Sequence, residues 1–592
     1  MALLPCLPSQ FPCSPVTGFV RLPLLSSRRS SKGVQSSNYR FRCCINTGTS
    51  VSQPLRRAAS YPQNIWDDSY IQALNCGYMG DEQVNEIRKL KEEVRQLFSD
   101  SKEILYQIEL IDELQQLGVA YHFQDEIKDK LSTIFFSLEK TRLFMDNDLK
   151  ATSLIFRLLR EHGFHLSADI FNSFREDEGN FKLCLKNDME GMLSLYEASF
   201  LAIEGDNQLD EARMFATEHL KHLSESLVEA SLRERVAHAL ELPLHWRMPR
   251  LHTRWFIDCY EKKVDMNSKL CRLAKLDFNF VQSIYKRELK ELSRWWTNLG
   301  LGQKLNFARD RLVENYLFVI GWAFEPKLWQ NREAMTMANC LVTTLDDIYD
   351  IYGSLDELEL FTDAVNRWDA EAIEQLPDYM KTCIMALFNT TNLTAYKIMH
   401  TKGVNIIPQL RRSWADLCKA YLVEAKWYHS GYMPTLEEYL DTAWISISGP
   451  LVLTQAYCTS ENITDEALKC YNFYPDVVRQ SSMISRLWND LATSTAEMER
   501  GDVPKSIQCY MHEKGVSEEV AREYIRDIIV SISKKFDYDC ISNSSIAESL
   551  KSVALDVHRM SQCVYQYEDG YGEQGHQKRE QVISLLIEPI PL

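Results

Sequence analysis

Glycine and proline are scarce in this sequence, supplying only 22 and 18 of its 592 residues, both below ordinary usage. Long amphipathic stretches rich in Leu, Glu and Lys separate them. One such stretch carries apolar residues at helical spacing in an otherwise charged background: Val84, Ile87, Leu90, Val94, Leu97 and Phe98. The composition and the periodicity together predict an all-α protein.

The sequence also lacks a long apolar run and an ordered cysteine pattern. Its longest uncharged stretch after the first 55 residues, Thr442 to Ser460, spans 19 residues but contains Ser, Gly, Pro and Gln, which argues against a membrane span. The 16 cysteines form no C-x-x-C pair and show no Cys/His ligand spacing. Neither a zinc site nor a disulfide framework is indicated.

Acidic residues are absent from Met1 to Trp66, where eight Arg or Lys occur. Because the whole chain has a net charge of −17, the remaining 526 residues carry an excess of 25 negative charges. An acid-free segment rich in Ser and Arg, without a secretory-type apolar core, is typical of an organellar transit peptide. The alternative is a basic tail that binds anionic partners. The acidic body argues against nucleic acid or an anionic membrane as a partner.

Three carboxylates, those of Asp346, Asp347 and Asp350, are concentrated at the end of an apolar segment with helical periodicity. Gly353 marks the end of that helix, and the residues from Ser354 to Glu357 form a capping-box pattern that opens the next one. The helix dipole is already negative at this end, so the carboxylates are unfavourable there unless a cation neutralises them. Oxygen-only ligands are what Mg²⁺ or Mn²⁺ prefers. The alternative is a solvated acidic helix end.

A second set of oxygen donors lies about 140 residues further on, in a segment that runs from near Pro475 to Gly501. Asn489, Thr493 and Glu497 are spaced i, i+4, i+8 and share one stripe of a helix. These are hard oxygen ligands, although an ordinary polar helix face has the same appearance.

Basic residues near both sets suit a phosphate group. Arg486 precedes the second stripe by one turn, and Lys505 follows the helix end. The pattern from Arg309 to Arg311 precedes Asp346 in a stretch that we expect to be helical, although two arginines flanking an acid are also common in surface ion-pair clusters.

One apolar helix is expected to be broken. Within Thr442 to Ser460, the run from Ser446 through Gly449 to Pro450 interrupts the hydrogen-bond ladder because Pro450 has no N–H to donate. Freed carbonyl oxygens could then point into a cavity. A kinked core helix is the alternative.

These motifs together resemble those of plant class I terpene synthases. R-D-R at Arg309 to Arg311, D-D-x-x-D at Asp346 to Asp350 and N-D-x-x-T-x-x-x-E at Asn489 to Glu497 occur in the family's order and spacing. Arg56-Arg57 followed after eight residues by Trp66 resembles the R-R-x8-W mark of the angiosperm monoterpene synthase branch. The resemblance runs from about Arg56 to Leu592.

The resemblance implies two helical domains, an N-terminal α-barrel-like domain at 56–270 and a C-terminal class I helical bundle at 271–592, after a plastid transit peptide at 1–55. It implies three Mg²⁺ ions, or Mn²⁺, bound by the two oxygen stripes, and a diphosphate held by Arg309, Arg486 and Lys505. Arg56 and Arg57 would cap the site during isomerisation of geranyl diphosphate, or merely tether the N-terminal arm. The expected enzyme is a stromal chloroplast lyase that acts as a monomer.

The carbocation is expected to sit in an apolar cavity, since no protein nucleophile is required. Aromatic rings can stabilise it by cation–π interaction, although most aromatic residues are plain core. Asn339 lies two helical turns before Asp346 and could orient a water molecule that quenches the cation, giving an alcohol or ether such as α-terpineol or 1,8-cineole; otherwise a neighbouring group satisfies its amide. The expected cavity residues are Phe318 (where relatives commonly carry Trp), Trp322, Asn339, Tyr421, Ser446, Gly449 and Tyr571.

Other functions remain as alternatives at this point. Within the same class, the product could be an acyclic alcohol such as linalool or geraniol, or an olefin such as limonene or myrcene. A sesquiterpene synthase would share the metal motifs, but the leader and the Arg56-Arg57 tandem argue against it. A chain-elongating prenyltransferase should show a second D-D-x-x-D. The remaining alternative is a non-enzymatic helical interaction protein whose acidic patches are solvent faces.

Overall fold

The structure is a computed structural model. It describes residues 56, 61–100, 103–138, 147–177, 179–222, 229–461, 463–500, 503–542, 547–565 and 576–592, without the side chains of 470, 472 and 495–500. The predicted transit peptide, Arg57, Tyr571 and the side chain of Glu497 therefore lie outside the described residues.

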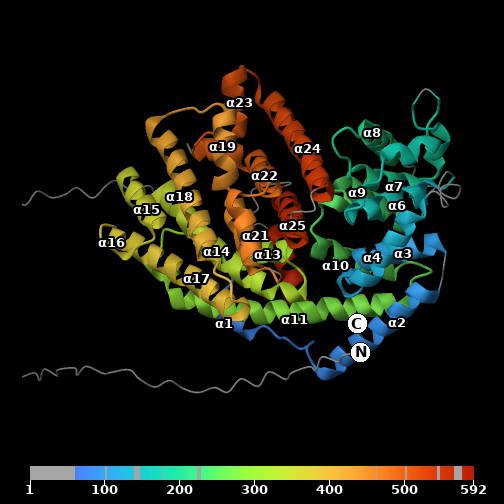
Figure 1. Ribbon diagram of the computed structural model, residues 1–592, viewed down its shortest axis with the longest axis horizontal. Coiled ribbons are helices and arrows are strands. Elements are labelled where there is room, and N and C mark those ends of the chain that lie inside the picture. The colour runs from blue at the N-terminus through green and yellow to red at the C-terminus, as the bar shows by residue number, and fades with distance from the viewer. Residues whose placement is uncertain are drawn as a thin grey trace, which may run out of the picture. The chain divides into compact units, whose positions relative to one another are not determined.

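The N-terminal part of the chain is built from helices of moderate length (Figure 1). These are α1 (Asp68–Ala73), α2 (Asp81–Asp100), α3 (Ile104–Gln116), α4 (Gln124–Phe136), α6 (Leu149–Glu161), α7 (Met189–Ser199), α8 (Asn207–Lys221), α9 (Ala230–Glu241) and α10 (Pro249–Glu261).

The C-terminal part combines the longest helices with several short ones. These are α11 (Ser268–Leu299), α12 (Leu301–Lys304), α13 (Leu312–Trp322), α14 (Trp329–Asp347), α15 (Leu355–Arg367), α16 (Ala370–Ile373), α17 (Asp378–Lys402), α18 (Ile407–Ser430), α19 (Leu436–Ser446), α20 (Gly449–Thr459), α21 (Asp465–Cys470), α22 (Asp476–Arg500), α23 (Ser506–Lys514), α24 (Glu518–Ser542), α25 (Glu548–Tyr565) and α26 (His576–Val582).

The described residues form no β-strand, and their only bridge is the isolated pair Arg175 and Phe181. The all-α prediction is confirmed. No helix within the described ranges is both long enough and apolar enough to cross a membrane.

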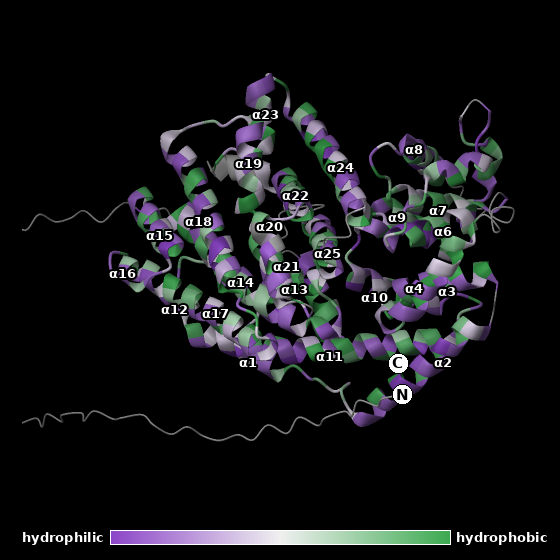
Figure 2. Cartoon of the chain, viewed as in Figure 1, coloured by the Kyte–Doolittle hydropathy of each residue, from purple (hydrophilic) through white to green (hydrophobic). Residues whose placement is uncertain are grey.

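Burial follows the predicted amphipathic patterns. In α2 the buried side chains are those of Ile87, Leu90, Val94 and Phe98, all members of the apolar stripe seen in the sequence. Figure 2 shows hydrophobic and hydrophilic residues mixed on outer helices such as α17 and α24. Burying the apolar face of each helix against its neighbours supplies most of the driving force for this arrangement.

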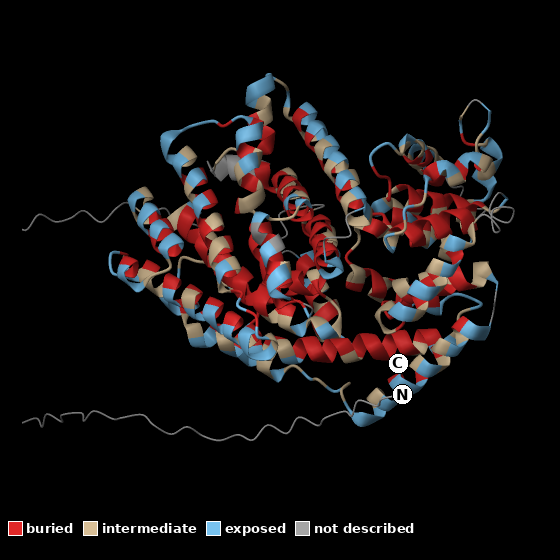
Figure 3. Ribbon diagram, viewed as in Figure 1, coloured by how far each residue is buried: buried red, intermediate tan, exposed pale blue. Residues whose placement is uncertain are grey.

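The longest helix, α11, connects the two groups of helices. It begins where the Asn267 side chain accepts hydrogen bonds from the backbone N–H groups of Lys269 and Leu270, and it ends at Gly300, whose φ of 66° is left-handed. It packs against α1, α2 and α10 and also against α13 and α14, and Figure 3 shows it buried along most of its length. The helix starts at Ser268, close to the expected boundary between residues 270 and 271, although the boundary itself stays a prediction.

Each group of helices has an apolar core of its own. One cluster gathers Phe156, Met192 and Leu195 from α6 and α7, and another gathers Tyr439, Ile484 and other residues of α19, α22, α23 and α24. A larger cluster contains residues of both groups, such as Leu154 of α6 and Leu417 of α18, and so joins them.

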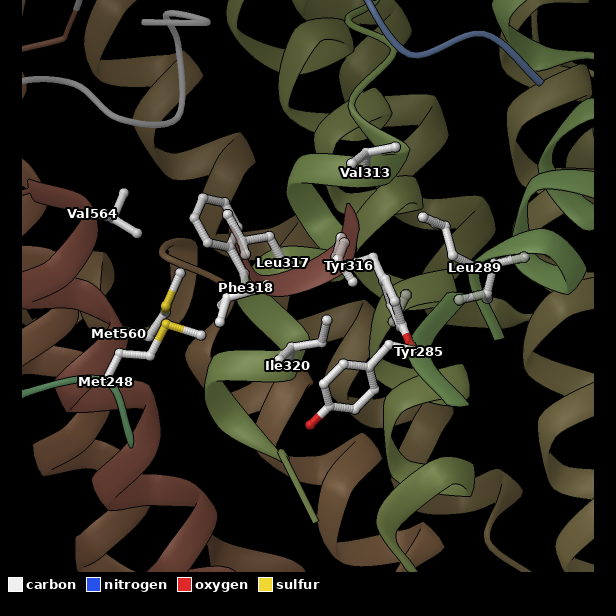
Figure 4. Close-up of a cluster of buried hydrophobic side chains, with 14 of the residues drawn as sticks. Met248, Tyr285, Leu289, Val313, Tyr316, Leu317, Phe318, Ile320, Met560 and Val564 are labelled. Carbon is white, nitrogen blue, oxygen red and sulfur yellow. The ribbon is translucent and has the colours of Figure 1, made fainter. Parts of the chain in front are cut away.

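Helix α13 lies at the centre of the larger core, with every residue from Leu312 to Gly321 buried. Figure 4 shows Phe318 of this helix within the same cluster of buried side chains as Met248 and Met560. The helix also carries buried polar groups that are satisfied: the Tyr316 hydroxyl donates to Glu288 at 2.7 Å. Close packing here gives the neighbouring site a rigid wall.

Candidate active site

The acidic cluster lies at the end of α14, as the sequence predicts. Asp346 and Asp347 occupy the last turn of that helix, and Asp350 follows in a single π-helical turn at Ile348–Tyr352. The backbone N–H of Gly353 closes this turn by donating to the Ile348 carbonyl at 2.8 Å. The sequence did not predict this wider turn, in which Asp346 and Asp350 no longer have the regular spacing of an α-helix.

Glycine is required at the end of this turn because a side chain would not fit there, and not because the backbone φ is left-handed. Gly353 has a φ of −74°, but a Cβ there would lie 2.6 Å from Leu358 Cδ2 and 2.9 Å from the Ile348 carbonyl oxygen. The predicted capping box begins at the next residue, where the Ser354 N–H donates to Glu357 Oε2 at 3.1 Å. The acidic cluster thus lies between the closed end of α14 and the capped start of α15.

Arg309 contacts two of the three carboxylates. Its guanidinium pairs with Asp346, its Nε lies 3.0 Å from Asp347 Oδ1, and its backbone N–H donates to Asp347 Oδ2 at 2.7 Å. The R-D-R pattern therefore lies in the loop between α12 and α13, and the expectation of a helix there was wrong. The reason is that the backbone N–H of Arg309 binds a distant carboxylate instead of a carbonyl of its own turn.

Asp347 is the most buried of the three, with 1% of its surface exposed. Burial raises the pKa of its carboxyl group, and the nearby charge of Arg309 opposes that rise. The Tyr61 hydroxyl also donates to this carboxylate, and the ring of Tyr61 lies 4.9 Å from the Arg309 guanidinium. A residue of the N-terminal arm thus contacts the acidic cluster directly, which the sequence analysis missed.

The second oxygen stripe lies on α22. Arg486 Nη1 donates to Asn489 Oδ1 at 3.0 Å, and the Thr493 hydroxyl donates to the Asn489 carbonyl at 3.0 Å. That bond uses the hydroxyl proton and leaves the lone pairs of Thr493 Oγ1 as acceptors. The backbone of Glu497 continues the same helix.

Arg486 is anchored at the end of α19. Its Nε donates to the Ala443 carbonyl at 3.3 Å and its Nη2 donates to Ser446 Oγ at 3.2 Å, while Ser446 donates in turn to the buried Glu424. Lys505 directly precedes α23, and its backbone N–H donates to Gln508 Oε1 at 3.0 Å. The structure therefore brings Arg486 and Asn489 together, as the sequence suggests.

The predicted break in the apolar helix is confirmed between α19 and α20. Ser448 adopts a left-handed φ of 67°, and Pro450 stands in the first turn of α20, so the Ser446 carbonyl has no N–H four residues ahead to accept from. Gly449 lies against α22, since a Cβ on it would be 2.2 Å from Ser482 Oγ and 2.7 Å from Ser482 Cβ.

The expected cavity residues are mostly buried. Phe318 and Tyr421 are each 4% exposed, and the rings of Phe318 and Trp322 are 6.4 Å apart. Burial raises the pKa of Tyr421 well above its usual value, and the charges of Asp346 and Asp350 raise it further, whereas Arg486 lowers it. The phenol of Tyr421 therefore lies within electrostatic reach of both the acidic cluster and the α22 stripe.

Asn339 is 6% exposed, and its Nδ2 donates to Asn315 Oδ1 at 2.9 Å. Asn315 in turn donates to Thr343 Oγ1 at 3.1 Å. One N–H of the Asn339 amide is thus bound within the protein, which fixes the orientation of the amide group.

Arg56 is bound in a pocket of aromatic and acidic groups. Its guanidinium makes two hydrogen bonds of 2.9 Å to Glu357, donates to the Tyr352 carbonyl at 2.9 Å, and lies 4.4 and 4.9 Å from the ring centres of Tyr352 and Tyr379. The hydrogen bonds that Arg56 donates to Glu357 raise the pKa of its guanidinium above its usual value. This contact fits the expectation that Arg56 tethers the N-terminal arm. The sequence did not predict that Glu357 would be its partner.

The residues fit an oxygen-bound divalent ion. Asp347 Oδ1 is buried and accepts no hydrogen bond of proper geometry, and the donor set of carboxylate, amide and hydroxyl oxygens suits Mg²⁺. Among the described residues, no three His, Cys, Asp or Glu side chains converge tightly enough to form a complete metal cage. An ion that keeps several waters and binds substrate phosphates does not need such a cage.

Comparison with known proteins agrees with this geometry. Residues 65–240 match the family described as terpene synthase, N-terminal domain, and residues 297–535 match the terpene synthase family, metal binding domain. Monoterpene synthase 8, chloroplastic, of Hedychium coronarium is 52% identical, covering 96% of this chain and 98% of its own. The (−)-alpha-terpineol synthase of Vitis vinifera is 48% identical, covering 96% of each chain.

A solved structure shows the same fold. Isoprene synthase from grey poplar leaves, in complex with three Mg²⁺ ions and dimethylallyl-S-thiolodiphosphate, superimposes with a TM-score of 0.82 at 45% identity and covers 89% of this chain and 99% of its own. The chain therefore belongs to the terpene synthase family, among the plant monoterpene synthases, with that family's two-domain helical fold.

Proposed function

We propose that this protein ionises geranyl diphosphate with Mg²⁺ and converts the resulting cation into a cyclic, oxygenated monoterpene of the α-terpineol or 1,8-cineole type. The observation that carries the proposal is that the buried phenol of Tyr421 lies within electrostatic reach of Asp346, Asp350 and Arg486. A buried aromatic ring near both charged stripes fits an allylic diphosphate, with its charged end at the stripes and its hydrocarbon beside the ring.

The two oxygen stripes divide the metal ligands between them. Asp346, Asp347 and Asp350 would hold two ions and Asn489, Thr493 and Glu497 a third, with Mn²⁺ as the alternative to Mg²⁺. The bound ions would neutralise the leaving diphosphate and so lower the barrier to breaking the carbon–oxygen bond. The related isoprene synthase with three Mg²⁺ ions supports this number.

Basic side chains would complete the diphosphate site. Arg486 is preorganised by its bonds to Ala443 and Ser446, and Lys505 stands at the start of α23. Arg309 already lies against Asp346 and Asp347, so it would reach the diphosphate after the ions have taken its place on these carboxylates. Fixed charges that do not reorganise stabilise a developing anion most effectively.

The carbocation would remain in the apolar part of the site. Phe318, Trp322 and Tyr421, and Tyr571 outside the described residues, would offer ring faces, and the Ser446 carbonyl at the helix break would offer a dipole. Asn339 keeps its amide nitrogen on Asn315 and would present its oxygen to a water molecule that adds to the cation. This supports an oxygenated product, as does the name of the related terpineol synthase.

The N-terminal arm would help to close the site. Arg56 binds Glu357 and the carbonyl of Tyr352, and Tyr352 lies two residues after Asp350. Together with Arg57, Arg56 would hold the arm in place while geranyl diphosphate isomerises before cyclisation. Residues 1–55 would direct the enzyme to the plastid stroma, as the chloroplastic name of its relative suggests. We also propose domain limits of 56–270 and 271–592 and a monomeric enzyme.

The test is an assay of purified protein lacking residues 1–55, with Mg²⁺ and either geranyl or farnesyl diphosphate, followed by gas chromatography. Cyclic monoterpene alcohols or ethers from geranyl diphosphate are expected. Linear alcohols or olefins would overturn the product assignment, turnover of farnesyl diphosphate alone would indicate a sesquiterpene synthase, and no turnover would contradict the enzyme. Asp363→Asn on the outer face of α15 is a control for substitutions in the acidic cluster, because the Asp363 carboxylate pairs with Arg367 at the surface.

A further inference from the structure

Asp490, which follows Asn489 in the second stripe, has both carboxylate oxygens occupied by protein groups. The Tyr439 hydroxyl lies 2.9 Å from each oxygen, and the backbone N–H of Ser506 donates to Oδ2 at 3.2 Å. Asp490 and Tyr439 are both wholly buried, at 0% exposure. These contacts point away from a role as a metal ligand and toward a role within the protein.

A buried carboxylate is costly unless it is paired and hydrogen-bonded, so its partners show what it holds. Ser506 is the first residue of α23 and directly follows Lys505. Because the Lys505 N–H is bound by Gln508 and the Ser506 N–H by Asp490, two successive N–H groups of this turn are fixed. The backbone from which the Lys505 side chain extends is therefore fixed by Asp490 of another helix.

The same carboxylate also faces Arg486. Arg486 Nη1 lies 3.6 Å from Asp490 Oδ1, one helical turn away on α22. The same guanidinium also donates to Asn489, Ser446 and the Ala443 carbonyl. Asp490 thus supplies a negative charge beside Arg486, while the neutral partners fix its direction.

We infer that Asp490, held in place by Tyr439, is a positioning residue that aims both Arg486 and Lys505 at the diphosphate. Asp490 joins α19, α22 and the start of α23 in one buried contact, so the two basic side chains keep a constant separation. The inference rests on the proposed function, because it takes the leaving diphosphate as the ligand of these two residues. Tyr439 has no contact with the substrate in this scheme and acts only through Asp490.

The test measures diphosphate binding without turnover. Inorganic diphosphate is titrated in the presence of Mn²⁺ into the wild type, Asp490→Asn and Tyr439→Phe by calorimetry, and KM and kcat for geranyl diphosphate are measured on the same proteins. We expect Asp490→Asn to weaken diphosphate binding about tenfold, the scale of one lost charged contact. Tyr439→Phe should also weaken diphosphate binding, but by a smaller factor. Lys505→Met is then combined with Asp490→Asn, and we expect the double variant to bind diphosphate much better than independent effects would predict.

A matched control removes a tyrosine–carboxylate bond elsewhere. Tyr260, 3% exposed, donates to Glu113 at 2.9 Å in the N-terminal part, so Tyr260→Phe should lower the melting temperature without changing diphosphate affinity. If Tyr439→Phe and Asp490→Asn lower only the melting temperature, as this control does, the inference is overturned. Strictly additive effects of Asp490→Asn and Lys505→Met on diphosphate affinity overturn it as well.

Should Asp490→Asn fail to fold, Tyr439→Phe alone decides whether the inference holds. A wild type that binds diphosphate but turns over no geranyl diphosphate would contradict the proposed function. The effect of Asp490 and Tyr439 on diphosphate affinity could still be measured in that case.

Discussion

Arg309 and Asp347 are joined by both backbone and side chain: the Arg309 N–H lies 2.7 Å from Oδ2, and the guanidinium Nε lies 3.0 Å from Oδ1. The guanidinium therefore stands where a cation is required to neutralise the end of α14. In the proposed mechanism, a divalent ion would compete with this arginine for Asp346 and Asp347. Ion binding and the release of Arg309 toward the diphosphate would then be one exchange.

Replacing Asp347 by Asn keeps the size of the side chain and removes its charge. We expect turnover of geranyl diphosphate to fall by about a hundredfold or more, because preorganised charge at the leaving group is lost. The rate is measured over a range of MgCl₂ concentrations, with Asp363→Asn as the control. Unchanged turnover at every concentration would contradict the assignment of the acidic cluster.

Alanine at both Arg56 and Arg57 should suppress cyclic products far more than acyclic ones, because the arm would no longer stay closed during isomerisation. Product ratios are read by gas chromatography. Glu357→Gln is the informative partner, since it weakens the ion pair with Arg56 and leaves both arginines present. If Glu357→Gln reproduces the alanine pattern, Arg56 acts by tethering the arm, whereas unchanged ratios in the double alanine variant would refute any role in cyclisation.

Asn339→Ile should shift the products from oxygenated to olefinic monoterpenes, because the amide oxygen proposed to orient water is removed. The change also deprives Asn315 Oδ1 of its donor, which costs about 1–3 kcal/mol of stability. The melting temperature is therefore measured beside the product profile. A stable variant with an unaltered profile would dispose of the proposed role of Asn339.

His558 predicts a pH dependence of stability. It is 1% exposed, and burial, followed by the charges of His245 and Arg559, lowers the pKa of its imidazole to about 3. The unfolded chain binds this proton below about pH 6.5 and the folded chain does not, so the free energy of unfolding should fall as the pH drops from 6.5 toward 3. The limit for one such group is about 1.4 kcal/mol per pH unit.

The measurement is the urea midpoint at several pH values between 7.5 and 5. His558→Gln removes the titrating group, so its midpoint should depend less steeply on pH than that of the wild type. The comparison uses the slope alone, since the substitution also changes packing around Gln562, which contacts His558 at 3.2 Å. Equal slopes in both proteins would show that His558 does not titrate on unfolding.

The features that could be predicted from the sequence are local ones. The helix before Asp346, the capping box at Ser354 and the break before Pro450 each depend on a few neighbouring residues, and all three occur in the structure. The assignment of ligands to the two stripes depended in addition on the family resemblance.

The features that escaped prediction depend on contacts between distant segments. Arg309 leaves the helical pattern because Asp347, 38 residues away, binds its backbone. Glu357 is a capping residue in the sequence and becomes the partner of Arg56 only because the arm returns across 301 residues. Tyr439 and Asp490, 51 residues apart, likewise have no local pattern that links them.

Gly449 sets a limit on how this enzyme can be redesigned. Even a methyl group at that position would collide with Ser482, and relief would require α20 to shift away from the helix that carries Asn489 and Thr493. A library intended to enlarge or reshape the hydrocarbon pocket should therefore leave this residue intact and vary Phe318 or Trp322, whose side chains lie on a separate helix. In the proposed mechanism, product specificity would change there without disturbing ionisation.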